Sequence, residues 1–418
     1  MKMNKAYKFR IYPNKEQKVL MAKTFGCVRF IYNKMLGDKI EHYNRTKDSG
    51  EAGEMLKVTP ARYKADFEFL KEVDSLALAN AQMNLDKAYS EFFKEKSHKY
   101  SEKTKERAKI LGKPLTLYDL EKHPKFKSKK SNHNSYTTNL VNGNIELVNG
   151  SNGSERTAGN ELPLRTAEYL KLPKLGMVKV KQHRIIPEGY TLKSVTVSRT
   201  PSDKYYASVL YEYEQSIEPV RIENVVGLDF SMTELYIDSN GNEANYPRYY
   251  RRALDKLKRM SRTLSKMQKF SNNWYKQKHK IAVLHERIAN QRKDFLHKQS
   301  RQIANAYDLV GVEDLNMKAM SQALNFGKSV SDNSWGMFTS FLDYKLTDMG
   351  KRLVKIDKWF PSSKLCSVCG YKNDEITLSM REWICPNCGV IHNRDINAAV
   401  NIRNEAIANI TDGRLVTA

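Results

Sequence analysis

The sequence has no long apolar run. No stretch approaches the ~18 consecutive apolar residues of a membrane-spanning helix. The N-terminal segment MKMNKAYKFRIYPNKEQKVL also lacks the apolar core of a secretory signal. These absences predict a cytoplasmic protein. With 418 residues and an apolar fraction of 40%, the chain is expected to form about two to four domains with real cores.

Acidic residues are scarce relative to basic ones. The chain has 47 Asp and Glu against 71 Lys and Arg, which leaves a net charge of +24. A merely basic soluble protein seldom carries an excess of this size. The charge therefore predicts a polyanionic partner, and nucleic acid is the partner that fits it best.

Cysteine is also rare, and its distribution is uneven. Of five cysteines, four follow the pattern C-x2-C, fifteen residues, C-x2-C, and they are Cys366, Cys369, Cys385 and Cys388. Each pair precedes a glycine, so two tight turns can present four thiolates to one zinc ion. A closed four-sulfur site has no open position, which predicts structural zinc. Cys27 lies in the apolar-rich FGCVRFIYNKML and is expected to be a core residue.

The N-terminal half reads as a strand, a helical block and more strands. Residues 5–12 alternate like a strand, and 15–93 have helical periodicity. Strand patterns return at 177–183, 190–200 and 204–214, which indicates an antiparallel meander or small barrel that the first strand can join. Between 139 and 163, Asn-Gly signals predict short hairpins or loops.

A basic segment, KFKSKKSNHNSY at 125–136, separates the helical block from the later strands. Such a run can be a solvated loop, or its cations and aromatics can contact phosphates and bases. The nucleic-acid-binding candidates are Lys125, Lys127, Lys129, Lys130 and Tyr136.

The C-terminal half alternates short apolar strands with helices. Strands are expected at 225–230, 233–242, 308–316 and 352–360, and a long basic helical hairpin at about 248–307. That hairpin can be a packed bundle arm, line a nucleic-acid channel, or do both.

Three carboxylates stand at the ends of these elements. Asp229 and Glu313 follow apolar strand cores, and Asp395 opens the last helix. An acid in a buried strand is costly unless something neutralises it, and two Mg²⁺ ions held by carboxylates can do so while activating water for phosphodiester hydrolysis. Taken singly, Asp229 can be a turn residue, Glu313 half of a salt bridge and Asp395 a helix cap.

The chain resembles the TnpB family, transposon-encoded RNA-guided nucleases similar to the ancestors of type V CRISPR effectors. The matching segments, in family order, are KAYKFRIYPNKEQ (5–17), FGCVRFIYNKML (25–36), KFKSKKSNHNSYTTN (125–139), LKLPKLGMVKVKQHR (170–184), GLDFSMTELYIDSNG (227–241), VGVEDLNMKAM (310–320) and the cysteine region with HNRDINAAVNI (364–402). Segments 94–120 and 140–165 read as variable insertions.

The resemblance implies a multidomain α+β fold. It consists of a helical recognition lobe, a small β-barrel wedge domain and an RNase H-like (RuvC) α/β nuclease domain with an inserted four-cysteine zinc ribbon. The implied bounds are 1–14 for the first wedge strand, 15–124 for the recognition lobe, 125–215 for the wedge barrel, 216–361 and 392–410 for the nuclease, 362–391 for the zinc insertion and 411–418 for the tail.

The resemblance also implies an activity and its partners. Asp229, Glu313 and Asp395 match the three catalytic carboxylates that hold Mg²⁺. A guide RNA from the transposon right end is expected to pair with double-stranded DNA beside a short motif that the protein reads. The protein would be prokaryotic and associated with the nucleoid when it binds DNA.

One position departs from the family pattern. Members often have His-Asp-Arg-Asp where this chain has His392, Asn393, Arg394 and Asp395. The acid assigned to the metal is retained. The alternative function is an RNA-guided DNA-binding repressor without cleavage, but such relatives lose the carboxylates that are present here.

Overall fold

The chain divides into an N-terminal unit, Met1–Gln215, and a C-terminal unit, Ser216–Ala418. The computed structural model describes residues 2–47, 56–94, 98–130, 134–149, 167–323, 327, 332–377 and 379–411. Among these residues, no helix combines the length and apolar character needed to cross a membrane. Of the predicted 139–163 loop region, residues 150–163 lie outside the described part.

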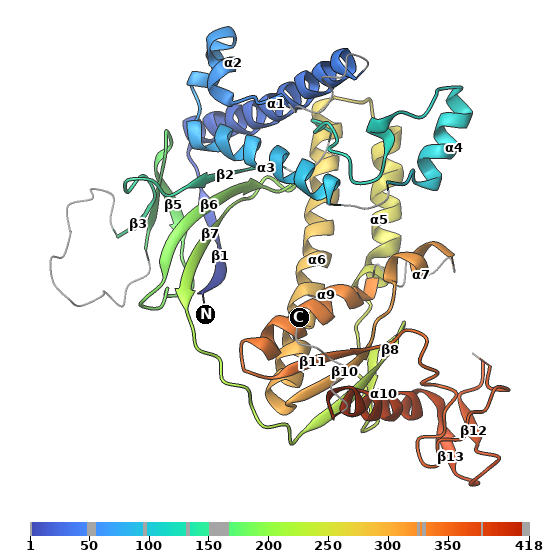
Figure 1. Cartoon of the computed structure of the whole chain (residues 1–418). Coiled ribbons are helices and arrows are strands. Elements are labelled where there is room, and N and C mark those ends of the chain that lie inside the picture. Colours follow the sequence, from blue (N-terminus) through green and yellow to red (C-terminus); the bar gives the residue numbers. More distant parts are fainter. Residues whose placement is uncertain are drawn as a thin grey trace. The chain divides into compact units, whose positions relative to one another are not determined.

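A seven-stranded sheet organises the N-terminal unit (Figure 1). Its strands are β1 (Lys2–Tyr12), β2 (Asn134–Asn139), β3 (Glu146–Val148), β4 (Tyr169–Leu172), β5 (Gly176–Lys181), β6 (Thr191–Arg199) and β7 (Tyr205–Glu214). The order is β2-β6-β7-β1-β5-β4-β3, and every pairing is antiparallel. The predicted meander is therefore confirmed, with the first strand at its centre.

The sheet is a half-barrel, which corrects the expectation of a closed barrel. β2 and β3 form its two edges, and no pairing joins them among the described residues. Alternate side chains of β7 are buried, from Tyr205 through Ala207 and Val209 to Tyr213. Helices, rather than further strands, cover the apolar face and complete this core.

The helical block contains α1 (Lys15–Thr46), α2 (Pro60–Asp66), α3 (Ser75–Phe93) and α4 (Glu102–Leu111), with short 3-10 turns at Glu68–Lys71 and Leu117–Asp119. A reciprocal capping box between Asn14 and Gln17 starts α1 immediately after Pro13 ends the strand. α1 and α3 contact each other and β2. Cys27 is buried in this core, as predicted.

A four-stranded sheet organises the C-terminal unit. Its strands are β8 (Val225–Ser231), β9 (Leu235–Asp238), β10 (Leu309–Glu313) and β11 (Arg352–Ile356), in the order β11-β10-β8-β9. β10 is parallel to both β8 and β11, whereas β9 is antiparallel to β8. The predicted strands are thus present, and those expected at 233–242, 308–316 and 352–360 are shorter than predicted.

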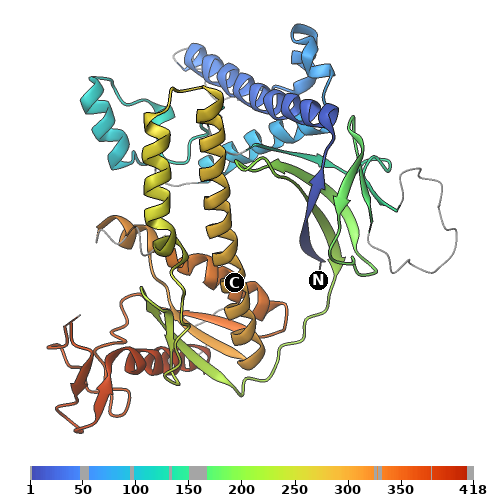
Figure 2. The ribbon, with the colours of Figure 1, turned by 180° about the vertical axis from the view of Figure 1, so that it is seen from behind.

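Helices cover both faces of this sheet. The helices of this unit are α5 (Tyr249–Lys266), α6 (Asn272–Ala306), α7 (Met317–Ala323), α9 (Trp335–Thr347) and α10 (Arg394–Thr411). Val226, Leu228, Val310 and Val312 share a core with α6 and α9. The alternate residues of the same strands face α10. The long hairpin of α5 and α6 confirms the helical region predicted there (Figure 2).

A small cysteine-rich module lies in the chain between β11 and α10. It includes the antiparallel pair β12 (Glu382–Ile384) and β13 (Ile391–Asn393). We refer to residues 362–393 as the zinc module.

Candidate active site and zinc module

The parallel pairing of β8 and β10 brings two of the predicted acids to the same edge of the sheet. Leu228 lies opposite Val312, so the next residues, Asp229 and Glu313, lie at neighbouring positions. Both point to the face that α10 covers, because side chains alternate along a strand. Both are half-buried.

The third acid is placed by the close contact of α10 with the sheet. A Cβ on Gly227 would fall inside the contact distance of the Ala399 carbonyl, so the helix rests directly on this glycine. Asp395 lies one turn before Ala399 and therefore on the same side of α10. Asp229 lies two residues after Gly227 on the same face of β8. This geometry brings Asp395 towards Asp229.

The electrostatics of Asp229 show that the three acids influence one another. Burial raises the pKa of Asp229 well above its ordinary value, and the charges of Glu313 and Asp395 raise it further. Burial also raises the pKa of Glu313, although a hydrogen bond from Ser362 opposes the shift. The charge of Arg394 lowers the pKa of Asp229 without cancelling these effects, so Asp229 is the acid with the least compensation for its charge.

Asp395 is held by two arginines. Arg394 donates to its Oδ1 at 2.7 Å, and Arg381 donates to its Oδ2 at 2.8 Å. Among the described residues, only the four cysteines form a group of three or more His, Cys, Asp and Glu side chains gathered closely enough to hold one metal ion as they stand. The Asp395 carboxylate is directed to these arginines, and that of Glu313 to Ser362.

Asn393, which stands where family members often have aspartate, has a structural role. Its side-chain oxygen accepts hydrogen bonds from the backbone N–H groups of Asp395, at 3.1 Å, and Ile396, at 3.2 Å. Asparagine is a preferred residue for satisfying the free N–H groups at a helix start. Asn393 thus caps α10 and fixes the turn that carries Asp395.

Two asparagines that the sequence reasoning missed connect α10 to the zinc module. Asn401 donates to the Ser362 carbonyl at 2.8 Å and to the Leu365 carbonyl at 2.7 Å. Asn397 donates to the Leu365 carbonyl at 2.6 Å and accepts from the Ser367 N–H at 2.9 Å. Their i, i+4 spacing on one helix face was the signal available in the sequence. Together they align the first turn of the zinc module with the acids.

The four predicted cysteines converge as expected. Their sulfur atoms all lie within 4.8 Å of one another, with separations of 3.6 Å for Cys366–Cys388 and for Cys369–Cys385. Sulfurs bound tetrahedrally at ~2.3 Å would be spaced similarly. Gly370 adopts the positive φ of +74° that its turn requires, and Gly389 does so at +71°. The donor set therefore fits structural zinc.

His392 links the zinc module to the acidic edge. Its Nε2 lies 3.0 Å from the Cys366 sulfur, and its ring contacts Trp383. A neighbouring donor of this kind orients a metal ligand. His392 comes directly before the Asn393 cap, so the zinc module and the start of α10 are connected through adjacent residues.

The basic segment at 125–130 lies against α1. Lys125 donates to the carbonyls of Tyr118 and Leu120, and Lys127 lies 3.9 Å from the ring centre of Tyr32. All four lysines of the segment are exposed. Because the Nζ groups of Lys125 and Lys127 already make these contacts, Lys129 and Lys130 are the more available candidates for phosphate contact.

Tyr136 requires a correction. It lies on β2 with 4% of its surface exposed and contacts Phe25, with ring centres 5.8 Å apart. Position 136 falls on the buried side of a strand that pairs with β6, which the short polar sequence around it did not reveal. Tyr136 is a core residue here and presents no free ring for a base.

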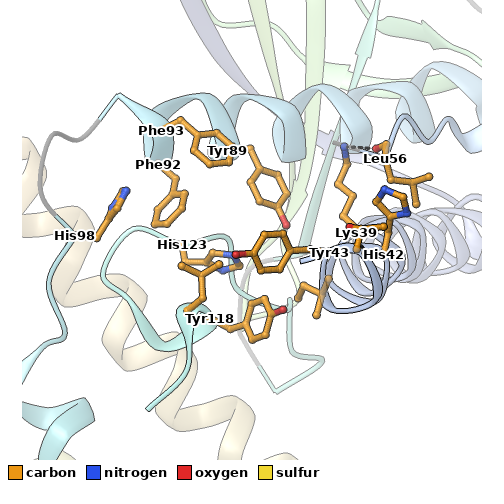
Figure 3. A pocket seen from close by; sticks show the side chains of 13 residues that line it. Lys39, His42, Tyr43, Leu56, Tyr89, Phe92, Phe93, His98, Tyr118 and His123 are labelled. Carbon is orange, nitrogen blue, oxygen red and sulfur yellow. Dashed lines mark hydrogen bonds between the residues drawn. The ribbon is translucent and has the colours of Figure 1, made fainter. Parts of the chain in front are cut away.

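An aromatic cavity of about 410 Å³ lies in the N-terminal unit (Figure 3). Tyr43, Tyr89, Tyr118 and His123 face a common space between α1, α3 and the segment before residue 124. Burial lowers the pKa of His123. The residues that line the cavity include no carboxylate, so it lacks the hard oxygen ligands that Mg²⁺ prefers.

Family models match three parts of the chain. Residues 208–324 match the model OrfB of IS605, described as "Probable transposase", and residues 335–402 match a "Cas12f1-like, TNB domain". Residues 1–48 match a "Helix-turn-helix domain". In the described residues of that last range, the structure has one strand and the single long helix α1.

Curated relatives match almost the whole chain. A protein of Streptomyces pristinaespiralis named "Putative RNA-guided DNA endonuclease" is 32% identical, covering 97% of this chain and 90% of the relative. InsQ of Escherichia coli K12, named in the same way, is 27% identical and covers 100% and 96%.

The fold is also shared with a solved structure. The protein in a Cas12f1–sgRNA–target DNA complex superimposes with a TM-score of 0.51 at 15% identity, covering 96% of this chain and 99% of that one. The fold, the family models and the near full-length relatives agree. The chain belongs to the TnpB (OrfB of IS605) family of RNA-guided DNA endonucleases.

Proposed function

We propose that this protein is an RNA-guided DNA endonuclease whose catalytic residues are Asp229, Glu313 and Asp395. The observation that carries the proposal is the convergence of these acids at one edge of the nuclease sheet. They come from two parallel strands and a helix that are far apart in the sequence, and the pKa of Asp229 responds to both other acids.

The donor set fits Mg²⁺. Carboxylate oxygens are the hard ligands that this ion prefers, and burial together with the charges of Glu313 and Asp395 raises the pKa of Asp229, a cost that a bound cation would offset. Asp229, Glu313 and Asp395 would hold the metal, with two ions as the expected number. Bound there, Mg²⁺ would supply charge neutralisation and an activated water for phosphodiester hydrolysis.

The surrounding residues orient these acids. Ser362 donates to Glu313, which fixes one carboxylate from the first turn of the zinc module. Arg394 and Arg381 keep the Asp395 carboxylate at the start of α10, and they place positive charge where a scissile phosphate would approach. Zinc in the module would then be structural, because it holds the segment that carries Ser362 and Arg381.

The proposed partners are a guide RNA and double-stranded DNA. The relatives are named for RNA-guided DNA cleavage, and a chain with a net charge of +24 suits two polyanions. We assign the RNA to the transposon right end and the reading of a target-adjacent motif to the predicted recognition lobe (15–124) and basic segment. Within that segment Lys129 and Lys130 are the preferred contact candidates, because Lys125 and Lys127 already contact neighbouring groups of the protein.

Cleavage of a plasmid tests this function. The full-length protein with its co-expressed RNA should cut a plasmid that carries the matching target and motif, and only with Mg²⁺. Asp229→Ala should abolish cutting while the complex still binds the same DNA. Cutting by Asp229→Ala at the wild-type rate would contradict the assignment of this acid.

The alternative, a guided repressor that does not cleave, makes a different prediction. The wild-type complex with Mg²⁺ and a matching guide would bind the target and leave it intact. The presence of all three acids near one edge of the sheet favours cleavage, because a binding-only protein has no need for a buried Asp229 whose pKa two further acids raise.

A further inference from the structure

The C-terminal unit presents exposed aromatic rings where α5 turns into α6. Phe270 is 73% exposed and Tyr275 is 53% exposed. Trp274 lies between them, with its ring centre 5.7 Å from that of Phe270 and 5.1 Å from that of Tyr275. We call these three residues the aromatic tip.

The backbone at the turn is held in a costly conformation. Phe270 has φ +67°, which lies in the left-handed region that a bulky side chain rarely adopts. Ser271 follows it and caps α6 by accepting from the Trp274 N–H at 3.2 Å. A turn of this kind usually carries glycine or asparagine. Here it carries a large apolar ring that remains in solvent.

The chain around the tip carries charge of one sign. Between Asp255 and Glu286 there are nine Lys and Arg and no acidic residue, and all nine cations are exposed. Lys278 lies with its Nζ 5.0 Å from the ring centre of Trp274. Exposed aromatic rings among cations suit a polyanion whose bases can stack on the rings. An apolar protein surface would not offer negative charges to the surrounding lysines and arginines.

We propose that the aromatic tip is a stacking site for unpaired bases of single-stranded DNA. Base faces are accessible in a single strand, whereas a duplex hides them except at its ends. The choice of DNA rests on the proposed function, since the tip belongs to the unit that carries the three acids. The rings bind the bases, and the surrounding lysines bind the phosphates.

The tip is remote from the chemistry. α6 has 35 residues and leads from the tip directly to β10, whose last residue is Glu313. Arg292 of α6 donates to the Asp332 carbonyl, and the next residue, Asn333, donates to Ser231 at the end of β8. At 1.5 Å per residue, about 30 Å of helix between Asn272 and Arg292 separates the aromatic tip from the acidic edge. Changes at the tip should therefore alter DNA affinity without altering the groups that would hold Mg²⁺.

Tryptophan fluorescence of the full-length protein tests the proposal. High salt first removes the bound RNA, and the salt is lowered again before the titration. Oligo(dT) should quench the emission of the wild-type protein, and most of this quenching should disappear in Trp274→Phe. Phe270→Ala with Tyr275→Ala should raise the Kd for oligo(dT) by at least about 30-fold, since stacking on each of the two lost rings contributes about 1–3 kcal/mol. Val283→Ala, which trims an exposed apolar residue of α6 without removing a ring, should leave the Kd unchanged.

Several outcomes would overturn the proposal. One is an unchanged Kd for oligo(dT) in the double variant. Another is tighter binding of a blunt duplex or of oligo(U) than of oligo(dT). A third is a wild-type protein that sediments as a dimer while the tip variants sediment as monomers, which would make the tip a contact between two copies of the chain. Plasmid cutting by the RNA-loaded wild-type protein is measured in parallel. If the wild-type protein binds oligo(dT) but never cuts the plasmid, the proposed function alone is refuted. If the plasmid is cut and the tip variants bind oligo(dT) as tightly as the wild-type protein does, the stacking site alone is refuted.

Discussion

Gly227 and Gly311 lie opposite each other in the parallel pair of β8 and β10, and α10 rests on both of them. A Cβ on Gly311 would lie 2.8 Å from the Cβ of Ala406 and 2.9 Å from the Ile402 carbonyl oxygen. Two adjacent positions without side chains let the helix approach the sheet closely. That approach sets where Asp395 lies relative to Asp229 and Glu313.

Gly227→Ala should therefore displace α10 and impair the active site. The new methyl group would meet the Ala399 carbonyl and the backbone of Arg403, neither of which can move without the helix. We expect a loss of at least tenfold in plasmid cutting and a destabilisation of about 1–3 kcal/mol, as for other overpacked sites. Gly336→Ala is the matched control in the same unit, because its Cβ would meet nothing within 4 Å. Equal activity in the two variants would contradict this role for Gly227.

The strands and cysteines that build the site could be predicted from the sequence, but the contacts between them could not. Strand periodicity located β8 and β10, and the C-x2-C spacing located the cysteine quartet, because both signals are local. The pairing of Gly227 with Gly311 depends on strand register, and the bonds of Asn397 and Asn401 depend on where α10 packs. Tyr136 was misassigned for the same reason, since its burial follows from pairing with β6.

Cys366→Ser should release zinc from the purified protein. It removes one of four thiolates whose convergence defines the site, so zinc content by atomic absorption should fall from about one ion per chain towards zero. The melting temperature should fall with it, because the module holds Ser362 beside Glu313. Cys27→Ser is the control. Cys27 is buried in the core of the N-terminal unit and is not one of the four converging cysteines, so this variant should keep its full zinc content. Full zinc content in Cys366→Ser would refute the site.

Asp229→Asn should stabilise the metal-free protein at neutral pH. The pKa of Asp229 is raised in the folded state, so the folded protein binds this proton more tightly than the unfolded chain does. Stability should consequently fall as the pH rises from the ordinary aspartate range towards the raised pKa, and the cost should persist above it. Asparagine carries no charge and should remove this loss. The melting temperature should rise by about 2–4 °C per kcal/mol relieved.

Thermal unfolding between pH 4 and pH 8 checks that expectation, with the metal chelated throughout. The wild-type protein should lose stability across the range relative to Asp229→Asn. Added Mg²⁺ should then raise the melting temperature of the wild-type protein more than that of the variant. Asp255→Asn, at an exposed carboxylate of α5, should behave as wild type. Parallel curves for the wild-type protein and Asp229→Asn would show that Asp229 carries no electrostatic cost.

Asn401→Ala should uncouple the zinc module from α10 while leaving the zinc ligands in place. The Ser362 carbonyl would lose its bond from Asn401, and the Leu365 carbonyl would keep only the one from Asn397. Leaving a buried carbonyl without its partner costs about 1–3 kcal/mol. Because Ser362 also holds Glu313, plasmid cutting should fall more than zinc content does. Asn404→Ala, on the exposed side of the same helix, should change neither quantity. If Asn401→Ala instead lost zinc and activity in equal measure, the asparagine would act through the metal site rather than through the acidic edge.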